Sequence, residues 1–176
     1  MRHHRWPLTV ALLVICALFT TGRVTGTPRV IEARPLDTFP RERIAVETRS
    51  ARRIVFEAWR ADTDATRAQG LMFVEALDPL QAMIFIYDPP QQVTMWMKNT
   101  YVPLDMLFAD RSGCIVTVAA NAKPLSLDSI RGAGPVAYVV EIKAGTAAAH
   151  GIATGDRLVR FESEQQPAAH GAPCTH

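Results

Sequence analysis

The stretch VAYVVEI, Val136–Ile142, is the strongest strand signal in the sequence. It is rich in β-branched and aromatic residues, which favour extended backbone, and GAGP at 132–135 breaks the chain just before it. Earlier in the chain, MIFIY (83–87) and VTMWM (93–97) are short runs that are apolar on both faces. Such runs predict strands that are covered on each side.

Further short strand signals fill most of the remaining sequence between residues 43 and 161: RIAVETR (43–49), RIVFEAWRA (53–61), PLDMLFAD (103–110), CIVTVAA (114–120) and DRLVRF (156–161). PLDMLFAD and CIVTVAA flank the turn DRSG, so they predict a hairpin. One short helix is expected from a cap at Asp62 or Thr63 to Gly70, and an Ala-rich one ends at Gly151. About eight short strands with two short helices predict a mainly-β fold, either a compact sandwich or a partly closed barrel.

The N-terminus carries a targeting signal. A basic start, MRHHRWP, precedes the apolar run Leu8–Phe19, which fits a secretory signal and is short for a membrane span. We expect export to the periplasm or beyond, with cleavage after Gly22 or Gly26. The alternative is an uncleaved segment that anchors the chain to the inner membrane. The predicted organisation is a signal peptide or anchor at 1–26, a linker at 27–43, the domain at 44–162 and a disordered tail at 163–176.

The charge of the chain argues against nucleic acid as a partner. Of 19 Lys and Arg residues, three lie in the first 26 residues, which leaves 16 basic side chains against 17 acidic ones. A near-neutral chain with interspersed charges lacks the electrostatic footprint of a nucleic-acid-binding protein. Contact with a membrane is expected only through the N-terminal segment.

Export changes how the cysteines are interpreted. Cys16 lies in the signal, while Cys114 and Cys174 remain in the mature chain. An oxidising compartment would allow these two to pair. The alternative is two independent thiols, because Cys174 lies close to the end of the chain.

Familiar catalytic and metal-binding patterns are absent from the sequence. There is no Gly-rich phosphate loop, Gly-x-Ser-x-Gly elbow or His-Glu-x-x-His motif. His150 is the only histidine of the predicted domain, and a place at the end of a helix suits it. Five methionines fall mainly in apolar runs, which favours core packing over a copper(I) site: Met72, Met83, Met95, Met97 and Met106. We therefore predict no metal and no cofactor, and assign no catalytic residue.

The stretch TMWMKNTYVPLDM, Thr94–Met106, mixes core and polar residues and is predicted to form both a hairpin and one wall of a site. On a strand, Trp96 and Lys98 share one face, while the methionines lie on the other. Asn99 suits the turn that follows, and Asp105 comes just after it.

Glu141 is a carboxylate inside the most apolar strand, where it needs a partner or water. Lys98 is the obvious partner for Asp105 or Glu141. Two interpretations stay open: a structural ion pair, or a ligand pocket with Trp96 as its apolar wall and these polar groups around it.

Several blocks resemble a prokaryotic family known as domain of unknown function 192: QGLMF (69–73), MIFIYDPP (83–90), WMKNTYVPLDMLF (96–108), NAKPLS (121–126) and YVVEIKAGTAAAHGIATGD (138–156). The resemblance implies a compact, mainly-β domain, often behind a signal or anchor, and no established activity. The family usually has Arg before Gly-Leu-Met, where this chain has Gln69. Arg67 matches the Arg on the family's short helix, which adds it to the candidate site residues.

The sequence thus predicts an exported single-domain protein. Its leading interpretation is a non-catalytic binding module for a small polar ligand or envelope component, with candidate site residues Arg67, Trp96, Lys98, Asn99, Asp105 and Glu141. The alternative is a structural or interaction protein without a ligand pocket. An enzyme of hydrolase type is less favoured; it would use Asp105 or Glu141 as general acid or base and Lys98 to stabilise charge.

Overall fold

A computed structural model describes residues 33–161 and Cys174. Over this part of the chain the predicted mainly-β fold is confirmed. The strands are β1 (Arg41–Glu47), β2 (Arg53–Ala61), β3 (Gln81–Gln91), β4 (Thr94–Met95), β5 (Leu104–Ala109), β6 (Ile115–Ala122), β7 (Ile130–Arg131), β8 (Val136–Lys143) and β9 (Arg157–Arg160). The helices are α1 (Asp64–Gln69), α2 (Thr146–His150) and the 3-10 helix η1 (Leu36–Thr38).

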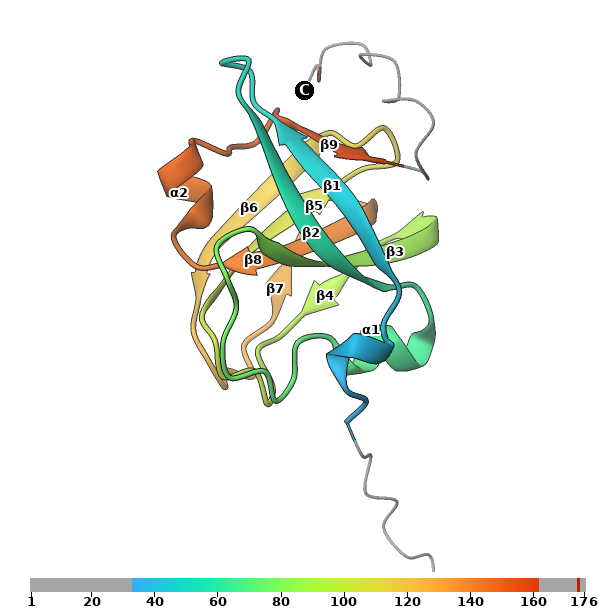
Figure 1. Ribbon diagram of the computed structural model, residues 1–176. Coiled ribbons are helices and arrows are strands. Elements are labelled where there is room, and N and C mark those ends of the chain that lie inside the picture. Colours follow the sequence, from blue (N-terminus) through green and yellow to red (C-terminus); the bar gives the residue numbers. More distant parts are fainter. Residues whose placement is uncertain (1–32, 162–173, 175–176) are drawn as a thin grey trace, which may run out of the picture. The chain divides into compact units, whose positions relative to one another are not determined.

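Seven of these strands form one sheet in the order β6-β5-β8-β3-β2-β1-β9, and β4 pairs with β7 in a second sheet. All paired neighbours run antiparallel except β2 and β3. The large sheet curls on itself (Figure 1). Its two ends meet in a β-bridge between Cys114 and Arg157, next to a hydrogen bond of 2.7 Å from the Leu158 amide to the Gly113 carbonyl. The fold is therefore the partly closed barrel, one of the two predicted arrangements.

The two faces of the curled sheet carry two separate apolar layers. The first, here called the barrel core, receives buried side chains from all seven strands: Ile44, Phe56, Ile84, Leu107, Ile115, Val140 and Leu158. The second, here called the outer layer, takes the alternate positions of the central strands, such as Met83, Met106 and Val139. Side chains alternate along a strand, so each central strand serves both layers.

The outer layer is covered by the short elements and loops of the chain. Buried residues of these segments pack into it, among them Phe39, Leu71, Leu77, Met95 and Met97. Figure 1 shows α1, β4 and β7 at the same end of the fold, where they flank β3 and β8. Core packing, which the sequence favoured for the methionines, is confirmed for the four buried ones: Met83, Met95, Met97 and Met106.

Both predicted helices form with the expected ends. The Thr63 hydroxyl accepts a hydrogen bond of 3.2 Å from the Thr66 amide, and the Thr66 hydroxyl accepts one of 3.0 Å from the Thr63 amide. This reciprocal cap satisfies amides that the first turn of α1 leaves free. Gly70 ends α1 at φ +52°, and Gly151 ends α2 directly after His150.

The predicted hairpin at Thr94–Met106 is wrong. β4 pairs with β7, whereas β5 lies between β6 and β8 in the large sheet, so residues 96–103 connect two different sheets. The physical reason is that every residue of β5 is buried, which suits an interior strand that is covered on both faces. The second predicted hairpin, β5 with β6, is confirmed.

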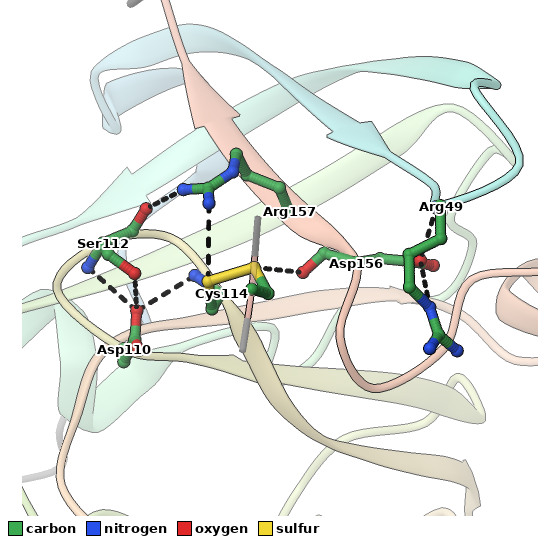
Figure 2. Close-up of a disulfide and its surroundings, with 7 residues drawn as sticks. Arg49, Asp110, Ser112, Cys114, Asp156 and Arg157 are labelled. Atoms are coloured by element: carbon green, nitrogen blue, oxygen red, sulfur yellow. Dashed lines mark hydrogen bonds and ion pairs between the residues drawn. A yellow bond between two sulfur atoms is a disulfide. The ribbon is translucent and has the colours of Figure 1, made fainter. Parts of the chain in front are cut away.

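Cys114 and Cys174 form a disulfide, so the pairing that the sequence left open is present (Figure 2). The Arg157 guanidinium donates to Cys114 Sγ at 3.6 Å and to the Ser112 carbonyl at 2.6 Å. The disulfide thus lies where the two ends of the curled sheet meet. It also holds Cys174 there, because the Cys174 Sγ lies 3.7 Å from the Asp156 carbonyl.

Two predicted segments lie outside the described residues: the signal or anchor at 1–26 and, apart from Cys174, the tail from 163. Within the predicted linker at 27–43, η1 forms and β1 begins at Arg41. Phe39 is buried in the outer layer, so regular structure starts before the predicted boundary. No helix in the described ranges is long and apolar enough to span a membrane.

Candidate functional site

A pocket of about 310 Å³ lies at the edge of the outer layer, between α1, β4 and β8. Four of the six residues that the sequence singled out line it: Arg67, Trp96, Lys98 and Glu141. The other lining residues are Asp64, Ala68, Gln69, Gly70, Leu71, Met72, Phe85, Tyr87, Thr94, Met95 and Thr100. Its volume falls at the lower end of the range of about 300–1,000 Å³ that is typical of small-molecule sites.

Glu141 is the buried polar group of the pocket. It lies opposite Met83 of β3 and Met106 of β5, and only 4% of its surface is exposed. Its Oε2 atom has no hydrogen-bond partner among the described residues. Burial raises the pKa of Glu141 to about 8, because removal from water disfavours the charged form. At neutral pH the side chain is therefore mostly a carboxylic acid, which can donate a hydrogen bond.

Tyr87 of β3 lies close to Glu141 in the same pocket. Burial raises the pKa of the Tyr87 phenol to about 12, the Arg67 cation opposes this shift, and the Glu141 charge adds to it. The Tyr87 hydroxyl donates to Met95 Sδ at 3.8 Å. Tyr87 therefore stays neutral throughout the physiological pH range and already directs its proton to a neighbouring sulfur.

Arg67 is held firmly between α1 and β3. Its Nη1 donates to the carbonyls of Asp62 and Ile86 at 2.7 and 2.9 Å, and its Nη2 lies 2.5 Å from Asp64 Oδ1. The guanidinium also lies over the Tyr87 ring, 5.3 Å from its centre. Its charge is thus matched by a carboxylate, and its position is fixed by two elements.

Trp96 and Lys98 form the outer wall of the pocket. Trp96 follows directly after β4 and Lys98 lies in the turn that comes next, and 51% of the Trp96 surface is exposed. Lys98 Nζ lies 5.4 Å from the centre of the Trp96 ring, a cation–π contact. The ion pair with Asp105 or Glu141, one of the two interpretations that the sequence left open, is not formed: no carboxylate lies within 4 Å of Lys98 Nζ in the described part of the chain.

Asp105 does not line the pocket. Its neighbour Met106 faces the outer layer, so the Asp105 side chain lies on the barrel-core side of the sheet. There its carboxylate accepts backbone hydrogen bonds of 2.9 Å from Asn121 and from Ala147 in the first turn of α2. Asp105 thus fixes α2 and the end of β6, and its charge is satisfied by amides instead of by Lys98.

Asn99 lies beside the pocket and fixes the shape of its rim. It has φ +55°, and its carbonyl accepts a hydrogen bond of 2.8 Å from the Phe73 amide. In the same way, the Thr100 carbonyl accepts from the Leu125 amide at 3.1 Å. Phe73 and Leu125 also have positive φ, at 66° and 62°. Such strained residues persist where surrounding structure holds them, and they are common at binding sites.

Gln69, at the position where the family resemblance implied an Arg, has a defined role at the pocket edge. Its Oε1 accepts a hydrogen bond of 2.8 Å from the Arg34 amide, and its Nε2 donates to the Arg34 carbonyl at 2.7 Å. This paired contact joins the segment before η1 to α1. An amide side chain suits it because it both donates and accepts, which a guanidinium cannot do.

Sequence reasoning missed Tyr87, Asp64, Thr94 and Thr100, all of which line the pocket. For Tyr87 a signal existed: it is the one side chain with a polar group on its face of the run MIFIY. For the others no comparable signal is present, because their place depends on how α1 and β4 pack.

The fold and the site of the described residues define a mainly-β domain with a small, polar-walled pocket on the outside of a half-barrel. A family model described as DUF192, uncharacterized ACR, matches residues 45–160. The chain belongs to this family, as the sequence blocks predicted. No curated protein matches the chain.

Two solved structures are similar to this chain, each with a TM-score of 0.68. One, from Sinorhizobium meliloti 1021, is described as a candidate transcription regulator; it is 41% identical, over 69% of this chain and 95% of that one. The other is a protein of unknown function from Novosphingobium aromaticivorans DSM 12444. It is 37% identical, over 72% of this chain and 90% of that one.

Proposed function

We propose that this protein is an exported binding module that holds a small polar ligand or part of an envelope component in the pocket between α1, β4 and β8. The observation that carries the proposal is that Glu141 lines the pocket while its buried Oε2 atom has no hydrogen-bond partner among the described residues. A buried polar atom without a partner costs free energy. A ligand that supplies the missing partner would recover that cost.

Export is supported by two independent features. The basic start and the apolar run Leu8–Phe19 fit a secretory signal. The disulfide between Cys114 and Cys174 belongs to the chemistry of oxidising compartments. We do not extend transcriptional regulation to this chain, because its formal net charge is only +2, without the strong excess of basic residues that is typical of DNA-binding domains.

The binding proposal is tested by a thermal-shift screen of the purified protein against several hundred small polar metabolites. Hits are then measured by calorimetry on Trp96→Ala and Tyr101→Ala. Both residues are about half exposed, but only Trp96 lines the pocket, so Tyr101→Ala is the matched control. Binding that is lost in the first variant and kept in the second supports the proposal. A screen without hits, or hits that both variants bind equally, would overturn it.

An enzyme is the second candidate, favoured by the raised pKa of Glu141, which is typical of a general acid. Asp105, the other carboxylate considered for such chemistry, lies on the opposite side of the sheet. To distinguish the enzyme from the binding module, each hit is incubated with the protein and followed by mass spectrometry. Conversion of a hit that Glu141→Gln abolishes would favour the enzyme, and unchanged hits favour the binding module.

A further inference from the structure

The charges around the pocket do not balance. Arg67 is paired with Asp64 at 2.5 Å, and these two charges cancel. Glu141 is mostly neutral at pH 7 because its pKa lies at about 8. Lys98 has no carboxylate within salt-bridge distance among the described residues. The pocket therefore carries the excess positive charge of one lysine ammonium.

The buried end of the pocket offers a hydrogen-bond donor that has no acceptor. Met83 and Met106, which lie opposite Glu141 on β3 and β5, provide no strong acceptor. Tyr87 is a neighbour that gives its own proton to Met95, but Glu141 Oε2 has no hydrogen-bond partner among the described residues, Tyr87 included. A protonated Glu141 thus has a hydrogen bond to give, and the open side on which it can give one is the pocket.

In the outer wall of the pocket, the flat apolar ring of Trp96 lies beside the ammonium group of Lys98. Half of the Trp96 surface is exposed, and Lys98 Nζ lies 5.4 Å from its ring. A ligand in contact with the indole would therefore lie within reach of the ammonium group. Flat or apolar ligand faces pack well on indole.

From these three features, and resting on the proposed function, we infer that the pocket binds a small organic anion: its charged group meets Lys98, its apolar face packs on Trp96, and an uncharged oxygen accepts a hydrogen bond from Glu141. A cationic ligand would meet the unpaired lysine and gain nothing from a neutral acid. A neutral ligand could accept a hydrogen bond from Glu141 and pack on Trp96, but it would bring no negative charge to Lys98.

The same arrangement makes binding depend on pH. Ionised Glu141 loses its proton to donate and places a negative charge in the pocket, so affinity falls as pH rises through about 8. The other charged or titratable groups that face this space are Tyr87 from β3, Arg67 and Asp64 from α1, and Lys98. Tyr87, with a pKa of about 12, keeps its proton over the range from about pH 6 to 9.

The test sorts the hits of the metabolite screen by charge and adds two matched sets of probes. One set is 4-hydroxybenzoate, 4-hydroxybenzamide and 4-hydroxybenzylamine, and the other is glucuronate, glucose and glucosamine. In at least one set, the acid should bind about tenfold more tightly than its neutral analogue at pH 7, and the amine more weakly still. Calorimetry gives the three affinities.

The experiment distinguishes failure of the anion inference from failure of the binding proposal. If the screen gives pocket-dependent hits but neutral or cationic compounds bind as well as anions, the anion inference fails and the binding module stands. If nothing in the screen or in the probe sets binds, both fail. Binding of an acid that does not change between pH 7 and 9 would exclude Glu141 as the donor.

Variants of Lys98 and Glu141 test whether the first recognises the charge of the ligand and the second donates the hydrogen bond. Lys98→Gln should remove the preference for the acid, whereas Lys143→Gln, an exposed lysine of β8 outside the pocket, should keep it. Glu141→Gln retains a donor at every pH, so its affinity for the acid should no longer fall above pH 8. Carbon NMR of the Glu141 carboxyl checks its titration independently of any ligand. A Lys98→Gln variant that keeps the full preference would overturn the inference.

Discussion

Asp105 and Glu141 lie on neighbouring strands of one sheet, but their carboxyl groups face opposite sides of it. In the β5–β8 register, Met106 is opposite Glu141, and Asp105 is opposite Ile142. Both acids are buried, yet their surroundings differ. Asp105 accepts two backbone hydrogen bonds, whereas Glu141 Oε2 has no partner in the described chain. One carboxyl group therefore has both oxygens bonded within the fold, and the other keeps an oxygen without a partner in the described residues.

Asp105→Asn should destabilise the protein by about 1–3 kcal/mol without changing the pocket. The asparagine amide group would face one of the two backbone N–H donors and lose that hydrogen bond. Urea denaturation measures the change, with exposed Asp78→Asn as the control. Loss of ligand binding in a folded Asp105→Asn protein would contradict this structural role.

Glu141→Gln should change how stability depends on pH. The pKa of Glu141 is about 8 in the folded protein, against an ordinary value of 4.5. Between these values unfolding releases a proton, so the free energy of unfolding of the wild type should fall from pH 5 to pH 8, by roughly a few kcal/mol. The glutamine variant lacks this contribution. Denaturation curves at pH 5, 6.5 and 8 compare the two, and parallel pH profiles would show that Glu141 titrates normally.

Lys98→Met should cost no more than about 1 kcal/mol, because the lysine makes an exposed cation–π contact and no ion pair with any residue that the structure describes. The difference from the wild type should also stay constant between pH 5 and 8. A loss of several kcal/mol at pH 7 that recovers in acid would instead indicate a carboxylate partner in solution.

Gly70→Ala should destabilise the fold by about 1–3 kcal/mol and loosen the pocket wall. Gly70 has φ +52°, and a Cβ atom there would lie 3.1 Å from Phe85 Cζ. Gly151→Ala is the comparison: it also ends a helix at positive φ, but its backbone is in the left-handed region, which Ala tolerates better, and nothing lies within 4 Å of the added atom. Thermal melts compare them, and equal losses would show that contact with Phe85 does not matter.

Cys174→Ser should lower stability by about 4 kcal/mol under oxidising conditions, because the disulfide links residues 60 positions apart and restricts the unfolded chain. Adding a reductant to the wild type should produce the same loss and leave the variant unchanged. A wild-type melting temperature that does not respond to reductant would mean that the disulfide contributes nothing to stability.

Several features of this protein follow from local sequence alone. The run Val136–Ile142 forms β8, since β-branched residues in an apolar stretch favour a covered strand. Thr63 and Gly70 mark the two ends of α1, because a hydroxyl cap and a positive φ are local requirements. The alternation along residues 94–98 likewise separated buried methionines from exposed Trp96 and Lys98.

Local sequence did not determine which strands pair with one another. Asn99 predicts a turn, but it cannot say whether the strand after the turn returns to β4 or enters another sheet. The full burial of β5 decides this, and that burial depends on β6 and β8 as neighbours. The hairpin prediction failed at this step.

The sequence by itself determined the seven strands of the large sheet, the helix ends, the family and three polar groups of the candidate site: Arg67, Lys98 and Glu141. Only the tertiary structure decided which carboxylate serves it. Period-two alternation assigns Asp105 and Met106 to opposite faces of their own strand. It does not say which of the two lies on the same side of the sheet as Glu141 of β8. The register between β5 and β8 places Glu141 on the side of Met106. That register is set by packing across the whole sheet, because a shift of one residue would exchange the two faces.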